Sequence, residues 1–181
     1  MRLIRDFTVL LSLALAAACG DSNGLADPTI DNVVDTITLG ALEGTPIQTP
    51  SAYSILNGAV RTDQTTAFEF AYNVDSTGRH VFLPQEVLGL SGSGVKPGLQ
   101  ASDAAFDAIT VAPSNGYIVD SAVAIEVGQR WLVRSRVFCT LGVPEYAKLE
   151  ILSFADSMVT FKVLADNNCG YKGLEPGLPD R

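Results

Sequence analysis

The chain has 181 residues, of which 47% are hydrophobic, 18% charged and 8% aromatic, and its formal net charge is −8. This apolar fraction excludes a disordered chain, and the deficit of Lys and Arg argues against binding to nucleic acid, whose phosphates attract basic side chains. A single histidine excludes a metal site built from several histidines.

The first segment of the chain has the features of an export signal. Arg2 and Arg5 precede residues 7–18, which are apolar except for two hydroxyl side chains and end in small residues. A membrane-spanning helix needs about 20 apolar residues, so this stretch is too short to span and matches the apolar region of a secretory signal peptide. We therefore expect residues 1–18 to be absent from the mature protein.

The end of this segment suggests a lipid anchor. Leu15-Ala16-Ala17-Ala18-Cys19 resembles the lipobox of bacterial lipoproteins, with Ala16 where most lipoboxes carry leucine. The resemblance implies that Cys19 receives diacylglycerol and becomes the new N-terminus. By the same resemblance, Gly20 in place of aspartate implies delivery to the outer membrane. The alternative is an ordinary signal peptide, in which Cys19 is incidental.

Removal of residues 1–18 takes away two arginines and one aspartate and leaves a formal charge of −9. Residues 19–28 are polar and rich in small residues, which is typical of a flexible tether. Residues 29–181 are enough for one domain with its own core.

Beyond the tether, apolar residues recur with a period of two, as in β-strands. Residues 29–42 are expected to form a first strand or a short helix, and residues 53–61 a weak strand. Residues 66–74 alternate most clearly, and a turn at 75–78 leads into a return strand at 79–83. The following Gly-rich segment, residues 89–98, departs from both the nucleophile-elbow and dinucleotide-binding patterns and is predicted to be a loop.

The alternation in residues 66–74 places Phe68, Phe70 and Tyr72 on one face of a strand, opposite Glu69 and Ala71. An aromatic stripe of this kind is most often part of a core. It is also the candidate lining of a cavity for a small ligand.

The last third of the chain predicts four consecutive strands at residues 122–127, 130–138, 146–153 and 158–165. Short turns join them, and each has one apolar face, so they are expected to form an antiparallel meander with one buried face. The fold class is therefore all-β, an antiparallel sandwich or a small barrel with this meander at its C-terminal end. Tyr146, Lys148 and Glu150 are assigned to the outer face of the meander.

Cys139 and Cys169 follow the second and fourth of these strands, which run in the same direction. Their ends lie at the same edge of a meander, and an exported protein permits disulfides, so we expect these cysteines to pair. A loop of this length stabilises a fold by roughly 3–4 kcal/mol in the chain-entropy model. Two buried free thiols are the alternative.

Arg130, Arg134 and Arg136 fall on one face of the second meander strand. Such a row is a candidate site for a carboxylate, a phosphate or an anionic glycan. The alternative, which we favour, is cross-strand pairing with Glu126 and Glu150 on a face exposed to water.

The sequence contains no recognisable catalytic or metal-binding motif, and we expect no cofactor. His80, the single histidine, has no nucleophile motif near it in the sequence, and a calcium-loop pattern is also absent.

Parts of residues 106–171, including Val133-Arg134-Ser135-Arg136, Tyr146-Ala147-Lys148-Leu149 and Asn168-Cys169-Gly170-Tyr171, resemble uncharacterised bacterial secreted lipoproteins. A fainter similarity is to β-rich haem-scavenging lipoproteins, which generally ligate haem with two histidines. We expect a lipid-anchored binding or envelope-interaction protein of the outer membrane that is not an enzyme. It would contact the membrane through the anchor, and an envelope protein or a small ligand is its further partner. The alternatives are a scavenger of a haem-like ligand and a hydrolase whose site is assembled from distant loops.

Overall fold

The computed structural model describes residues 25–90, 92–137, 139 and 141–180. The predicted signal peptide, residues 1–18, and the predicted lipidation site Cys19 therefore lie outside the described residues. Among the described residues, the regular structure is β except for a short 3-10 helix, η1 (Phe106–Ala108). No helix in this part of the chain has the length and apolar character that a membrane span requires.

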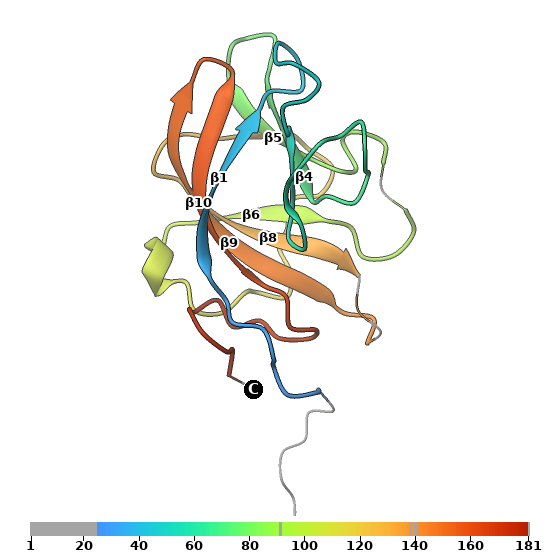
Figure 1. Ribbon diagram of the computed structural model, residues 1–181, viewed down its shortest axis with the longest axis vertical. Coiled ribbons are helices and arrows are strands. Elements are labelled where there is room, and N and C mark those ends of the chain that lie inside the picture. Colours follow the sequence, from blue (N-terminus) through green and yellow to red (C-terminus); the bar gives the residue numbers. More distant parts are fainter. Residues whose placement is uncertain (1–24, 91, 138, 140, 181) are drawn as a thin grey trace, which may run out of the picture.

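The described residues form two antiparallel five-stranded sheets (Figure 1). The first sheet has the strand order β1-β10-β9-β8-β6 and the second β3-β2-β4-β5-β7. Neither sheet closes into a barrel, so the prediction of an all-β sandwich is confirmed. The strands are β1 (Val34–Gly40), β2 (Ala52–Ser54), β3 (Gly58–Val60), β4 (Phe70–Val74), β5 (His80–Pro84), β6 (Gly98–Ser102), β7 (Val123–Ala124), β8 (Arg130–Val137), β9 (Pro144–Ala155) and β10 (Met158–Asp166).

The C-terminal meander has three strands, β8, β9 and β10, and the prediction of four is wrong. The expected first strand is the two-residue β7, which pairs with β5 in the second sheet. The chain then passes to the first sheet through a turn at Gly128, whose positive φ of 83° suits glycine. The place beside β8 is taken by β6, which begins at the end of the segment expected to be a loop.

The main core lies between the sheets and confirms the inner faces expected for β9 and β10 and for the first part of β8, whereas Val137 at the end of β8, expected on the same inner face, is exposed. The two-residue period holds because every second side chain of these strands points toward the second sheet. The core residues from these three strands are Trp131, Val133, Ala147, Leu149, Ile151, Val159, Phe161 and Val163.

The aromatic stripe belongs to the core only in part. Phe70 and Tyr72 are fully buried in the main core, where the ring centroid of Phe70 lies 4.3 Å from that of Phe82. Phe68 lies in a separate cluster with Ala52 and Ala71. The expectation that the three aromatic residues share one face is therefore wrong at Phe68, because β4 begins only at Phe70.

A second core covers the outer face of the first sheet. The loop that carries η1 and the C-terminal tail supply Phe106, Ile109 and Leu174, which pack on Tyr146 and other residues of the sheet. The sequence pattern predicts Tyr146 and Lys148 on the outer face of the meander, yet these residues are only 4% and 1% exposed. That prediction is wrong because the η1 loop and the C-terminal tail cover the outer face of β9 at these two residues.

Lys148 fastens this covering loop to the sheet. Its Nζ donates hydrogen bonds to the carbonyl oxygens of Phe106 and Ile109, both at 2.9 Å, and lies 4.5 Å from the centre of the Phe106 ring. A buried ammonium group is costly unless it is hydrogen-bonded, and burial lowers the pKa of Lys148. The two carbonyl bonds offset that cost and hold η1 in place.

Candidate functional site

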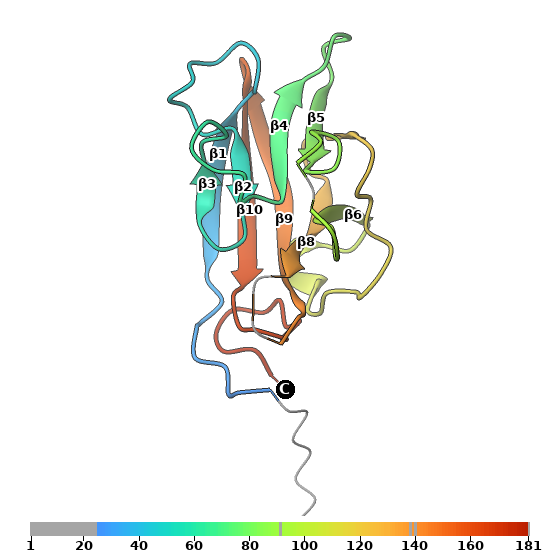
Figure 2. The same cartoon turned by 90° about the vertical axis from the view of Figure 1, so that its right-hand side faces the viewer.

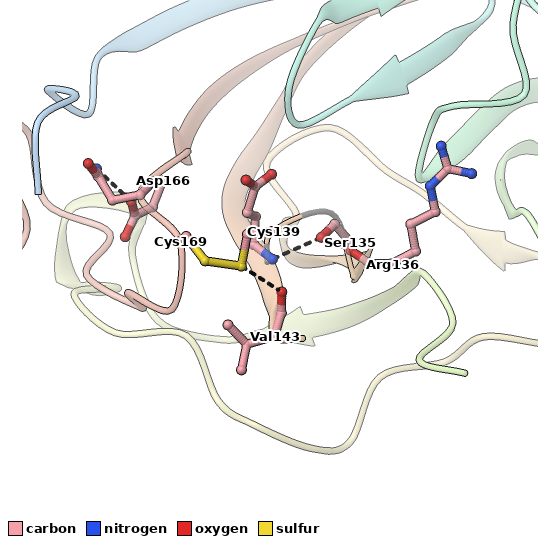
Figure 3. Close-up of a disulfide and its surroundings, with 8 residues drawn as sticks. Ser135, Arg136, Cys139, Val143, Asp166 and Cys169 are labelled. Carbon is pink, nitrogen blue, oxygen red and sulfur yellow. Dashed lines mark hydrogen bonds between the residues drawn. A yellow bond between two sulfur atoms is a disulfide. The ribbon is translucent and has the colours of Figure 1, made fainter. Parts of the chain in front are cut away.

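The predicted disulfide between Cys139 and Cys169 is present, with the two Cα atoms 5.7 Å apart. Figure 3 shows it linking the segment after β8 to the segment after β10, near Asp166. The two strands end at the same end of the sandwich, as the meander geometry required. This end is also where residues 25–33 enter the fold and the C-terminal tail lies (Figures 1 and 2).

Residues next to the disulfide hold the N-terminal segment in place. The Asn168 side-chain oxygen accepts hydrogen bonds from the backbone N–H groups of Thr29 and Ile30, at 2.9 and 3.0 Å. Its side-chain nitrogen donates to the carbonyl oxygen of Ile30 at 2.8 Å. One buried side chain therefore provides three hydrogen bonds to a segment almost 140 positions away in the chain.

Two neighbours of Asn168 extend this attachment toward the start of the described chain. The Tyr171 hydroxyl donates to the carbonyl oxygen of Ala26 at 2.8 Å. Gly170 has a φ of 88°, and a Cβ at this position would collide with the side chain of Leu25. We refer to Asn168, Gly170 and Tyr171 as the tether clamp.

Further hydrogen bonds tie the same segment to the C-terminal tail. Asn32 and Gly177 exchange backbone hydrogen bonds of 2.8 and 3.0 Å. The Asn32 side-chain nitrogen also donates to the carbonyl oxygens of Gly173 and Glu175, at 2.9 and 3.2 Å. In the part of the chain that the structure describes, the segment from Ala26 to Asn32 is thus joined by hydrogen bonds to the C-terminal part of the domain.

Asp166 supports the clamp from inside the sandwich. Its Oδ1 accepts hydrogen bonds from the backbone N–H and the side-chain nitrogen of Asn168, at 2.9 and 3.0 Å. The Asp166 side chain is fully buried, and burial raises its pKa despite these hydrogen bonds. Asp166 thereby fixes the orientation of the Asn168 amide, whose oxygen is then directed to the backbone N–H groups of Thr29 and Ile30.

Two surface cavities lie on either side of Tyr171. The larger has a volume of about 570 Å³ and combines the charged residues Lys172, Glu175 and Asp180 with apolar side chains such as Leu25 and Leu178. The smaller, of about 350 Å³, is formed by residues 26–30, Leu141 and the Asn168 region. Tyr171 contributes to both cavities, so the clamp and the cavities form one site at one end of the molecule.

The three arginines do not form the row that the sequence suggested. Arg130 donates to the carbonyl oxygens of Asp103, Ala104 and Gly128, at distances of 2.6–3.1 Å. Arg134 donates to the carbonyl oxygen of Lys96 at 3.1 Å and stacks over the Tyr117 ring. The alternative that we favour from the sequence, pairing of Arg130 with Glu150, is also wrong. Glu150 instead forms an ion pair with Lys162 at 2.9 Å.

Arg136 is separated from the other two arginines by an irregularity in strand pairing between Arg134 and Val137. Such a bulge changes the alternation of side chains along a strand. The Arg136 guanidinium is close enough to Glu69 to lower the pKa of that carboxyl. The arginines therefore serve different parts of the fold, and an anion site made of all three is not assembled.

Two buried glutamates lie near each other in the same half of the sandwich. Glu69 accepts a hydrogen bond from the backbone N–H of Ile55 at 2.6 Å, and its other oxygen is buried without a hydrogen-bond partner. Burial raises the pKa of Glu69 to about 8, and the neighbouring Glu145 contributes in the same direction. Burial likewise raises the pKa of Glu145. These carboxyls are 1% and 5% exposed, so they are closed off from a substrate in solution.

His80 lies at the opposite end from the tether clamp, among aromatic rings. Its Nδ1 is 2.6 Å from the Tyr72 hydroxyl, and its ring stacks on that of Phe154 with a centroid distance of 3.8 Å. These contacts link the two sheets across β5 and β9. The contacts that the structure shows for His80 are therefore structural.

The described residues contain no group of three or more His, Cys, Asp or Glu side chains that could hold a metal ion. Comparison with known proteins found no matching family model, no matching curated protein and no matching solved structure. The site must therefore be interpreted from its own geometry.

Sequence reasoning found the disulfide but missed the clamp around it. In the sequence, the run Asn168-Cys169-Gly170-Tyr171 indicates only a resemblance to secreted lipoproteins. The available signal for the clamp is the composition of this run, which places an amide, a glycine and a tyrosine beside a cysteine outside a strand. Such residues are suited to a closely packed loop, because each can make a contact with the backbone. The partner segment, residues 25–32, could not be inferred because nothing local specifies it.

Proposed function

We propose that this protein is a lipid-anchored lipoprotein of the outer membrane that acts as a non-enzymatic binding or envelope-interaction module. The observation that carries the proposal is the tether clamp, which holds residues 25–30 against the end of the sandwich where the two cavities open. An anchor attached at Cys19 would therefore emerge beside the candidate binding site.

The lining of the larger cavity supports binding. It presents both signs of charge, from Lys172 and from Glu175 and Asp180, next to the apolar Tyr171 and Leu178. Binding sites commonly combine an apolar wall with a few placed polar groups. The haem-scavenging alternative relied on a cavity behind the aromatic stripe, and Phe70 and Tyr72 are instead packed in the core.

The anchor is tested by labelling cells with radioactive palmitate. Wild-type protein should incorporate label into the membrane fraction, and the variant Cys19→Ala should lose it. The double variant Cys139→Ala/Cys169→Ala is the matched control, because it removes the other two cysteines and should keep the label. Equal labelling of wild type and Cys19→Ala would refute lipidation at this residue.

The binding site is tested by photocrosslinking in intact cells. A benzophenone amino acid at Leu178, beside the larger cavity, should give an adduct with an envelope component. The same amino acid at Ser76, in the exposed turn between β4 and β5 at the far end of the molecule, is the control (Figure 2). Equal adduct yields at the two positions would contradict a binding site at the clamped end.

A further inference from the structure

We infer that the clamped end of the sandwich rests on the lipid bilayer, with the cavity rims in contact with headgroups that carry no net charge. The inference rests on the proposed lipid anchor and identifies the partner of that same site. It depends on three observations: the small number of residues between Cys19 and the clamp, the exposed apolar side chains around the cavities, and the charge of this end.

The tether leaves little room between the domain and its anchor. The clamp holds the chain from Leu25 onward, and Cys19 is six positions earlier. Six residues span at most about 20–22 Å when fully extended. The headgroup region lies within that distance of the clamp, so the domain cannot stand far from the membrane.

The position of the clamp at one end of the domain also determines which end faces the membrane. Residues 25–33 and the C-terminal tail lie at one end of the long axis, and the β4–β5 turn lies at the other (Figures 1 and 2). β9 runs along this axis with 12 residues, which corresponds to about 40 Å at the rise of an extended strand. Six residues are too few to let the far end reach the bilayer while the clamp holds the chain from Leu25 onward.

The end that faces the anchor exposes large apolar side chains. Val111 and Leu178 border the larger cavity and are 63% and 55% exposed, while Ile30 and Leu141 border the smaller one and are 48% and 49% exposed. The two cavities share Tyr171, so these four side chains lie around one region of the surface and form an apolar patch. Patches of this kind mark interaction surfaces, and a bilayer interface accommodates them.

The charged residues at this end of the domain indicate which lipid headgroups it would contact. Asp27, Glu175 and Asp180 line the two cavities, and Lys172 is the one basic residue among the described lining residues. An acidic surface is repelled by anionic headgroups within about one Debye length. Zwitterionic headgroups present both an ammonium group and a phosphate, and therefore suit a surface where carboxylates lie beside a lysine.

The test uses the mature lipidated chain, purified from membranes and reconstituted into phosphatidylethanolamine/phosphatidylcholine vesicles that contain a nitroxide-headgroup lipid. A fluorophore is attached to Leu178→Cys, to Leu141→Cys as a second site on the patch, or to Ser76→Cys as the control. All three positions are exposed, and the native disulfide remains oxidised. Co-flotation with the vesicles verifies anchoring of each labelled protein.

We expect several-fold stronger quenching at positions 178 and 141 than at position 76, and weaker quenching at 178 when phosphatidylglycerol is added at low salt. Equal quenching at all three sites in protein that floats would overturn the inference and leave the anchor intact. A rise on adding phosphatidylglycerol would overturn the preference for uncharged headgroups. A protein adduct at Leu178 in cells would show that a protein covers the patch; it would overturn the lipid contact and leave the proposed binding module intact. Failure of flotation would overturn the anchor and the inference together.

Discussion

Replacing Asn168 with alanine removes the centre of the tether clamp. The Asn168 side chain makes four hydrogen bonds of 2.8–3.0 Å, three to residues 29–30 and one to Asp166. Each intramolecular hydrogen bond contributes a net 0.5–1.5 kcal/mol, and residues 29–30 are exposed enough for water to replace part of what is lost. We therefore expect Asn168→Ala to lower the free energy of unfolding by about 2–4 kcal/mol.

Urea unfolding measures the total loss, and hydrogen exchange measures where it occurs. The amides of Thr29 and Ile30 should exchange at least about tenfold faster in the variant, because about 1.4 kcal/mol of protection is a factor of ten. Asn73→Ala is the matched control, since its side chain accepts one hydrogen bond of 3.1 Å, from the N–H of Glu43 at the other end of the sandwich. A loss for Asn168→Ala no larger than that for Asn73→Ala, with unchanged exchange at residues 29–30, would refute the clamp.

Three further perturbations test other parts of the account. Because burial raises the pKa of Glu69 from 4.5 to about 8, the folded state retains a proton that the unfolded chain loses, so the free energy of unfolding should fall as pH rises between these values. At 1.36 kcal/mol per pH unit the fall due to Glu69 is at most about 5 kcal/mol. In urea titrations from pH 4 to 9, Glu69→Gln should make the profile less steep and leave only the dependence from groups such as Glu145 and Asp166, whose pKa values burial also raises. Parallel pH profiles for the two proteins would contradict this. Lys148→Met keeps the apolar stem but leaves the carbonyl oxygens of Phe106 and Ile109 without their hydrogen-bond donor. Limited proteolysis should therefore cut the η1 loop faster, and the free energy of unfolding should fall by about 1–3 kcal/mol. An unchanged cleavage rate would contradict the role of Lys148 in holding this loop. Replacing Cys139 and Cys169 with serine should cost roughly 3–4 kcal/mol in urea unfolding under non-reducing conditions, and a loss below about 1 kcal/mol would show that the bond contributes little.

The sequence predicted the inner face of the sandwich well because one rule governs it. Residues such as Val133, Leu149 and Phe161 alternate with polar neighbours, and strand periodicity alone places them in the core. The same rule failed for Lys148. Its burial depends on a loop about forty positions earlier in the chain, and no local pattern announces that contact.

Two other failures have local physical causes. The alternation through Arg136 assumes an unbroken strand, and the irregularity after Arg134 changes which side of the sheet the next side chains take. β7 has only two residues, and it pairs with β5 of the second sheet before the chain turns at Gly128. Such short strands carry too little periodic signal to reveal which sheet they join.

The candidate site was foreseen at one point, the pairing of Cys139 with Cys169. Strand direction and the export signal were sufficient for that prediction. The clamp required knowing that residues 25–32 lie beside Asn168 and Tyr171, a contact between the two ends of the chain. The cavities depend on the same contact, so they too could be found only in the folded structure.

The central claim is that a lipid on Cys19 anchors this domain by its clamped end. The most direct measurement is the intact mass of the protein extracted from membranes in detergent. The account predicts a chain that begins at Cys19 and carries the added mass of a thioether-linked diacylglycerol and further acylation. A mass equal to the unmodified chain, whether it begins at residue 1, at residue 19 or elsewhere, would contradict it.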